Sequence, residues 1–306
     1  MANVIVTGGS GFLGHHLCRA LLSAGHAVKN IDLNPNLEVP TVIADIRDIS
    51  RMLQEVRDAE VVIHLAALIE AGESVKFPQN FIDVNISGTV NILEAMKQNS
   101  IPSFIFSSSA AVYGEPLKSP IKEDDRTIPI NPYGMTKLAM EALVSSYVNS
   151  FRMTGIGLRY FNLYGTEEHH QPESHAIPRF IDQIKTGQKV TVWGSGEHLR
   201  DFIYISDVVD GHLKAMELAL RDPQKYHYFN LSTSKPTSVA EVIQKLEVLI
   251  GKKAFIHNFP NRPGDPLVLV ANSTKAKEIL GWEAKVQIDE GLQKTVEYFN
   301  SVHQTS

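Results

Sequence analysis

The chain has 306 residues, of which 43% are hydrophobic, so it can bury a large core in one folded unit or in two lobes that share a cleft. Its 29 basic and 34 acidic residues give a formal net charge of -5, and the basic residues are scattered, which disfavours a nucleic-acid-binding protein. The single cysteine, Cys18, excludes an intrachain disulfide or a thiolate metal site, and no stretch approaches the roughly 20 apolar residues that span a bilayer. We therefore expect a cytoplasmic protein that binds neither nucleic acid, nor a metal, nor a membrane.

A strand, a glycine-rich turn and a helix open the chain. Val4–Val6 is a short apolar run typical of a buried strand, and a helical pattern begins near Leu13. Gly8 permits a tight turn, Gly11 lets backbone N–H groups approach phosphates, and Gly14 lets the helix lie close to the sheet. We predict that a dinucleotide pyrophosphate binds here, at Gly8, Gly11, Phe12, Leu13 and Gly14. The G-x-x-G-x-x-G spacing resembles that of the short-chain dehydrogenase/reductase superfamily.

The second strand, Val28–Asp32, ends in an acidic residue at the expected distance past the glycines. A carboxylate at Asp32 would accept hydrogen bonds from the adenosine ribose 2′-OH and would repel a 2′-phosphate. No arginine stands beside it, so NAD is favoured over NADP as the cofactor. The alternative is that Asp32 only forms a turn at the strand end.

Two further strands are expected at 42–45 and 61–67. Asp45 and Ile46 resemble the pair that flanks the adenine in this superfamily, although Asp45 could instead cap a helix over 49–56. The second strand is continuously apolar, as in a parallel sheet that is buried on both faces. The resemblance places its end beneath the nicotinamide-side ribose, with Leu65, Ala66 and Ala67 as contacts. His64 is expected to be a core residue.

A long helix is predicted over 81–97, followed by a strand over Ser103–Ser109 and a loop rich in proline and charge over 115–130. Asn85 is polar where the helix pattern is apolar. In relatives a matching asparagine supports the active-site backbone and the cofactor, so we include Asn85 among the cofactor-binding residues, together with Ser107.

Tyr133 and Lys137 lie four residues apart at the start of a helix that runs to about Phe151, so both side chains share one face. A tyrosine with a pKa of about 10 is a poor base, and a nearby ammonium favours its phenolate. Lys137 could also hydrogen-bond the nicotinamide ribose, and Ser109 could hold a substrate hydroxyl beside Tyr133. The alternative is a surface Tyr and Lys that share a helix face by chance.

The order of motifs along the chain resembles the extended short-chain dehydrogenase/reductases, the NAD-dependent nucleotide-sugar epimerases and dehydratases. The motifs are TGGSGFLG, HLAA, VNISGTVNILEA, FSSSAAVYG, NPYGMTK, LRYFNLYG, RDFIYISDVVDGH and RPGD. The resemblance implies an α/β fold, with a Rossmann-type doubly wound parallel sheet and a smaller α/β substrate-binding lobe. We expect an NAD-binding domain over 1–165 and an interleaved substrate lobe over 166–306. The resemblance also implies a homodimer formed by the helices that begin near Phe81 and Tyr133.

The same resemblance assigns candidate substrate contacts in the second half. Tyr160 would border the nicotinamide, Asn162 would contact the substrate diphosphate, and Trp193 would stack on uracil unless it is a core residue. Arg200 and Arg262 would clamp the diphosphate, the alternative being surface ion pairs.

The resemblance also places Asp265 at the uridine ribose. Leu269 falls where the family places the wall of the sugar pocket, unless it is only a buried strand residue. The loop with His169 and His170 does not have the spacing of a zinc motif.

Dehydratases of the family carry an Asp-Glu pair directly after the catalytic Ser or Thr, whereas this chain has Ala110 and Ala111. Neither alanine can transfer a proton, so dehydration is disfavoured, and the glutamate of the uronate decarboxylases is absent too. Reversible oxidation at C4, which is 4-epimerisation, is the expected reaction, with a UDP-hexose as substrate. Gly72–Pro78 resembles UDP-galactose 4-epimerases, although Ile69 stands where some of these have a lysine. The alternatives are a uronate epimerase, a nucleotide-sugar reductase, or a non-catalytic NAD-sensing scaffold.

Overall fold

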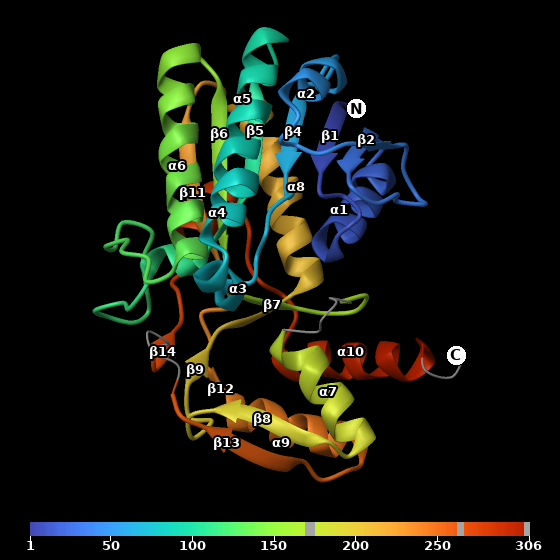
Figure 1. The fold of residues 1–306 in the computed structure, drawn as a ribbon, viewed down its shortest axis with the longest axis vertical. Helices are drawn as coiled ribbons and strands as arrows, with labels where there is room; N and C mark the ends of the chain where they lie inside the picture. Colours follow the sequence, from blue (N-terminus) through green and yellow to red (C-terminus); the bar gives the residue numbers. More distant parts are fainter. Residues whose placement is uncertain (169–174, 262–265, 303–306) are drawn as a thin grey trace.

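A seven-stranded parallel sheet forms the larger part of the computed structural model, which describes residues 1–168, 175–261 and 266–302 (Figure 1). Its strand order is β11-β6-β5-β4-β1-β2-β3, and every neighbouring pair is parallel. The strands are β1 (Asn3–Thr7), β2 (Ala27–Asp32), β3 (Thr41–Ile43), β4 (Val61–His64), β5 (Ser103–Ser109), β6 (Thr154–Tyr160) and β11 (Tyr226–Leu231). This is the doubly wound architecture expected from the sequence.

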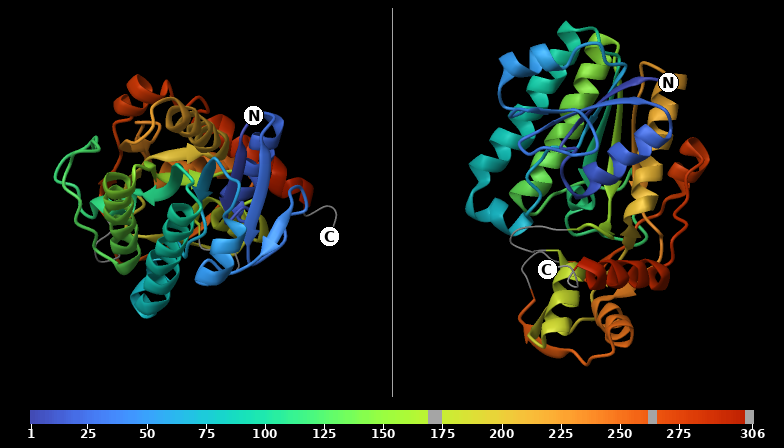
Figure 2. Two further views of the ribbon diagram at one scale, coloured as in Figure 1. Left: turned by 90° about the horizontal axis from the view of Figure 1, so that it is seen from above. Right: turned by 90° about the vertical axis from the view of Figure 1, so that its right-hand side faces the viewer.

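Helices cover both faces of this sheet (Figure 2). On one face α1 (Phe12–Ser23) and α8 (Ile205–Arg221) share a core with β1, β4 and β5. On the other, α2 (Ile49–Glu55), α5 (Gly88–Gln98) and α6 (Pro132–Phe151) share a second core with the same sheet. Because both faces are buried, the strands are apolar runs rather than alternating ones. None of the helices in the described ranges is long and apolar enough to cross a bilayer.

Three local expectations were wrong in detail. The helix expected over 81–97 is preceded by α3 (Ala71–Lys76) and α4 (Pro78–Phe81), and it contains a π-helical turn, η1 (Ile82–Ser87), before α5. The strand expected over 61–67 ends at His64, because the next three residues turn toward the glycine loop. Asp48, not Asp45, caps α2, since its carboxylate accepts a hydrogen bond from the Arg51 amide.

A smaller lobe lies at one end of the large sheet and contains short strands and helices (Figure 1). Its sheets pair β7 (Asn162–Tyr164) with β10 (Phe202–Tyr204), β9 (Leu199–Arg200) with β12 (Thr237–Ser238) and β14 (Val268–Leu269), and β8 (Lys189–Trp193) with β13 (Phe255–Phe259). Its helices are α7 (Ala176–Thr186), α9 (Val239–Ile250) and α10 (Ile288–Val302), and the π-helical turn η3 (Ala276–Leu280) packs on α8. The chain passes between the two parts repeatedly, since α8 and β11 return to the large sheet. The division at residue 165 stays a prediction.

A buried ion pair fixes α6 to the sheet. The guanidinium of Arg159 on β6 meets the carboxylate of Glu141 on α6 through two hydrogen bonds, of 2.8 and 2.6 Å, and both side chains are buried. Ser108 on β5 donates to the same carboxylate at 2.6 Å, and Arg159 also donates to the Tyr113 hydroxyl at 2.8 Å. Four segments of the chain are therefore joined at one buried point.

We expect Glu141→Ala to lower the free energy of unfolding by about 3–5 kcal/mol, because Arg159 would stay buried without its partner charge. Chemical unfolding followed by circular dichroism measures this loss. The control is Glu283→Ala, which removes an exposed ion pair with Lys277 and should cost less than about 1 kcal/mol. Equal losses in the two variants would contradict the importance of the buried pair.

Candidate active site

The carboxyl ends of the parallel strands meet at the edge of the large sheet that faces the smaller lobe (Figure 1). Gly8 follows β1, Asp32 ends β2, and Leu65–Ala67 follow β4. Ser109 ends β5 and Tyr160 ends β6. The topology therefore brings the residues expected at the cofactor and those expected at the reacting centre to one edge, as is usual for ligand sites in open α/β sheets.

The glycine loop leaves no room for side chains at two of its three positions. Gly8 has φ +76°, and a Cβ there would lie 2.6 Å from the Ala66 amide nitrogen. A Cβ on Gly14 would lie 2.2 Å from the Gly8 carbonyl oxygen. Gly11 is the N-cap of α1 and supplies no side-chain cap. The result is a narrow backbone cradle at a helix N-terminus, which suits a pyrophosphate.

Asp32 holds this loop against β2. Its carboxylate accepts hydrogen bonds from the amides of Ser10 and Asn34, both at 3.0 Å. Asn30 on the same strand accepts from the Gly9 amide at 2.8 Å and donates to the Ser10 hydroxyl at 2.9 Å. The loop is thus rigid before any ligand binds. The part played by Asn30 was not anticipated from the sequence, because nothing in its position along the strand distinguishes it.

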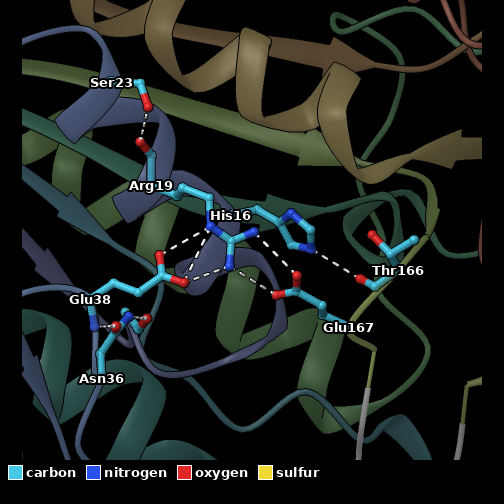
Figure 3. Close-up of polar contacts among 8 residues, drawn as sticks. His16, Arg19, Ser23, Asn36, Glu38, Thr166 and Glu167 are labelled. Atoms are coloured by element: carbon cyan, nitrogen blue, oxygen red, sulfur yellow. Dashed lines mark hydrogen bonds and ion pairs between the residues drawn. The ribbon is translucent and has the colours of Figure 1, made fainter. Parts of the chain in front are cut away.

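A second network joins this region to the segment after β7 (Figure 3). Arg19 on α1 lies between Glu38, at 2.6 Å, and Glu167, at 3.2 Å. His16 is 2.9 Å from the Thr166 carbonyl oxygen. The loop after β2 and the entry to the smaller lobe are therefore tied to the same helix. His169 and His170, which follow, lie outside the described residues. Within the described ranges, no group of three His, Cys, Asp or Glu side chains could hold a metal ion.

Asn85 lies in the π-helical turn and bridges two parts of the site. Its amide accepts from the Leu68 amide at 2.8 Å and donates to the Leu68 carbonyl at 2.9 Å and to the Thr136 hydroxyl at 3.0 Å. It thereby connects the chain after β4 with α6.

The Asp45 carboxylate, which follows β3, is paired with Arg47 at 2.6 Å, and Ile46 is buried against Gly88. Contact of these residues with a cofactor stays a prediction.

Lys137 is buried beneath the end of β5. Its ammonium donates to the Ser107 carbonyl at 2.8 Å and to the Ser107 hydroxyl at 3.1 Å. Burial lowers the pKa of Lys137 to about 7. Tyr133, one helical turn earlier, shares a hydrogen bond with Ser109, whose hydroxyl oxygen also accepts from the Ala111 amide at 3.1 Å. The Ser, Tyr and Lys expected at the reacting centre therefore do converge.

The sequence predicted that Lys137 would lower the pKa of Tyr133, and the structure contradicts this direction. Burial raises the pKa of the Tyr133 phenol above its ordinary value, the hydrogen bond with Ser109 opposes this, and the negative charge of Glu70 adds to the increase. The ammonium is directed to Ser107 rather than to the phenol. Both groups are desolvated, so each one favours its neutral form.

Two histidines in this region are structural. His64 contacts the hydroxyls of Thr7 and Thr89 at 2.7 and 3.1 Å, and it is a buried core residue, as expected. His212 Nδ1 is 2.9 Å from the Val208 carbonyl, so its Nε2 accepts from the Tyr160 hydroxyl at 2.7 Å. Tyr160 is thereby fixed at the end of β6, near Tyr133.

The candidate substrate residues lie in the smaller lobe. Arg200 on β9 is paired in register with Leu269 on β14, and its guanidinium donates to the Leu199 carbonyl at 2.9 Å. Leu269 packs against the buried cluster that includes Ala110 and Phe161, directly behind Ser109. Asn162 lies on β7, beside β10. Trp193 ends β8, with its ring 5.0 Å from that of Phe259. Arg262 and Asp265 lie outside the described residues.

Three acidic and basic side chains near the cleft were missed from the sequence. Glu168 is fully buried and hydrogen-bonded to His175, and His175 Nε2 is 3.9 Å from the carboxylate of Glu70. Glu70 precedes α3, so the contact spans from the larger part to the entry of α7. No motif in the chain identifies this cluster, because its members are brought together only by the fold.

Comparison with known proteins agrees with this arrangement. The profile of the NAD dependent epimerase/dehydratase family matches residues 4–231. The UDP-glucose 4-epimerase of Rhizobium leguminosarum bv. trifolii is 37% identical over 309 residues, which cover 94% of each chain. The crystal structure of Thermotoga maritima UDP-glucose 4-epimerase with UDP-glucose is 33% identical, covers 98% of this chain and 99% of that one, and has a TM-score of 0.92.

A third similar structure is that of a UDP-N-acetylglucosamine 4-epimerase from Methanobrevibacter ruminantium M1 in complex with UDP-N-acetylmuramic acid. It is 30% identical, has a TM-score of 0.90 and covers 98% of this chain and 99% of its own. The similarity in sequence and in fold thus extends over most of the chain. The chain therefore belongs to the NAD dependent epimerase/dehydratase family.

Proposed function

We propose that the protein catalyses the NAD-dependent 4-epimerisation of a nucleotide sugar, with UDP-glucose and UDP-galactose as substrates. The convergence of Ser109, Tyr133 and Lys137 beside the glycine cradle carries the proposal. The two residues that follow Ser109 are Ala110 and Ala111, which offer no acid or base for dehydration at the positions where the dehydratases carry Asp and Glu. The similar epimerases, one of which holds UDP-glucose, support the substrate class.

NAD would be held at the carboxyl edge of the sheet. The cradle formed by Gly8, Gly11 and Gly14 receives the pyrophosphate, and Asp32 receives the adenosine ribose. Lys137 and Tyr160 line the nicotinamide end. The chemistry that bound NAD would supply is the reversible transfer of a hydride at C4 of the sugar.

The reacting groups then have separate tasks. Tyr133 accepts the proton of the sugar 4-hydroxyl and later returns it, while Ser109 hydrogen-bonds the same hydroxyl. Lys137 binds the nicotinamide ribose and is held in place for this by its hydrogen bonds with Ser107. Arg200 holds the diphosphate while the sugar turns, so that either face of C4 can meet the cofactor.

The charge near Tyr133 favours a neutral sugar over a uronate. Glu70 lies close enough to Tyr133 to raise the pKa of its phenol, and a second carboxylate, Glu168, is buried behind His175. A uronate would bring a further negative charge to this part of the cleft, which costs free energy. N-acetylated hexoses remain compatible, since Leu269 is smaller than an aromatic wall.

The proposal includes a homodimer in the cytoplasm. The helices that the family resemblance places in a dimer interface expose Ile82, Met135 and Phe151, and the segment just before the first of them exposes Val75 and Phe77. A second copy that covers them would remove this apolar surface from water.

We expect the protein to interconvert UDP-glucose and UDP-galactose without consuming NADH, as followed by proton NMR on a panel of UDP-hexoses. Tyr133→Phe should lower kcat by about 10²–10⁴-fold, because the proton acceptor is lost. Tyr147→Phe is the control on the same helix, since that hydroxyl contacts Glu94 away from the site. Failure to convert any member of the panel, or stoichiometric oxidation of NADH, would contradict the proposal.

The Glu70→Gln variant tests the electrostatics of Tyr133. Removal of the negative charge lowers the pKa of Tyr133, so the rising limb of the kcat/KM pH profile should move to lower pH, by up to about one unit. Glu73→Gln on the helix that follows, α3, breaks only an exposed pair with Lys76 and should leave the profile in place. A shift toward higher pH in Glu70→Gln would contradict the assigned direction.

The Gly8→Ala variant tests the cradle. Its methyl group would overlap the Ala66 backbone at a φ that alanine rarely adopts, so we expect the purified protein to lose most of its NAD. The nucleotide released on denaturation is quantified by chromatography, and in the wild type it should be NAD rather than NADP. Gly72→Ala is the control, because a Cβ there meets nothing within 4 Å. Normal NAD content in Gly8→Ala would contradict the cradle.

A further inference from the structure

His198 is a buried side chain with unused hydrogen-bonding capacity. It is 4% exposed, and neither ring nitrogen has a hydrogen-bond partner among the residues that the structure describes. Buried polar groups are nearly always paired, and one left unpaired in a folded protein needs an explanation. A neutral imidazole offers one N–H donor and one acceptor, so the ring is equipped to bind a polar group that enters from outside.

The position of His198 places it beside the candidate diphosphate clamp. The residue directly precedes β9, and its carbonyl accepts from the Val239 amide at 3.3 Å, which extends the pairing of β9 with β12 by one residue. The Leu199 amide donates to the Leu267 carbonyl at 2.8 Å on the other side. In extended chain, residues two apart project to the same face, so His198 and Arg200 share a face of the strand.

The turn after β8 is shaped around the imidazole. Gly194 has φ +76°, and a Cβ at this position would lie 2.7 Å from His198 Cε1 and 3.2 Å from its Nδ1. The same Cβ would lie 2.2 Å from the Asn261 side-chain oxygen. Close packing against Gly194, next to Trp193, therefore fixes the position of the imidazole ring, and this position does not depend on a hydrogen bond within the protein.

We propose that His198 binds the nucleoside diphosphate part of the substrate, with a ring N–H donating to a diphosphate oxygen beside Arg200. This inference rests on the proposed function, because that function supplies the nucleotide sugar. The imidazole adds a directional donor to the charge of the guanidinium, and it acts on the nucleotide rather than on the reacting carbon. His198 is therefore a binding residue for the diphosphate and has no part in proton transfer at C4.

His198→Leu separates binding from folding. Leucine has a similar volume and no polar atoms, so the variant should fold with a Tm at or above that of the wild type and with normal NAD content. Its Kd for UDP, measured by titration calorimetry, should rise at least tenfold. His198→Gln keeps a donor and an acceptor and should stay within about threefold of the wild-type Kd.

The matched control is His227→Leu. His227 on β11 also has a buried ring nitrogen without a partner, but it lies in the large sheet, on a different strand from Arg200. This variant should bind UDP as the wild type does. Unchanged UDP affinity in His198→Leu would overturn the inference and leave the proposed function intact. If the wild type itself does not bind UDP, the proposed substrate class is wrong, whatever the variants do.

Discussion

The contact of α6 with the end of β5 is the constraint on which the site depends. Along one face of the helix, Tyr133, Lys137 and Glu141 follow one another at intervals of one turn, and they meet Ser109, Ser107 and Ser108 respectively. Only Glu141 is paired with an opposite charge, through Arg159. The ion pair therefore fixes the helix at its inner end, while the two groups nearer the edge of the sheet remain available for chemistry.

Desolvation of the reacting groups makes their charged forms less favourable. Lys137 is buried without a carboxylate, and Tyr133 is half-buried and desolvated near the carboxylate of Glu70, so both pKa values move toward the neutral forms. A rigid helix is needed to keep such groups in place, since an unpaired buried ammonium would otherwise turn toward water. The fixed side chains of Asn85 and Glu141 supply that rigidity from opposite directions.

The sequence predicted the parts of the site that depend on local spacing. Gly8, Gly14, Asp32 and the Tyr133–Lys137 pair could be placed because a strand, a turn and a helix fix their relative positions. Spacing says nothing about desolvation, and for that reason the pKa of Tyr133 was expected to move in the wrong direction. It also could not show the π-helical turn around Asn85 or the hydrogen bond of Asn85 with Leu68, which lies outside the helix. Glu70 and His198 were missed because only the tertiary fold gives them their neighbours.

In the proposed function, the larger part of the molecule holds the reacting groups and the smaller lobe selects the substrate. The reacting groups are held by the large sheet and α6, whereas Arg200, His198 and Leu269 lie on the short strands of the smaller lobe. Backbone pairing of β9 with β14 fixes the position of Leu269 relative to Arg200, but its side chain packs toward Phe161 beneath the reacting edge. In the proposed function, a different side chain at 269 would therefore change the space available to the sugar without moving Arg200. Because the hydride and proton transfers need only C4 and its hydroxyl, the same chemistry can serve sugars of different size once this wall is altered.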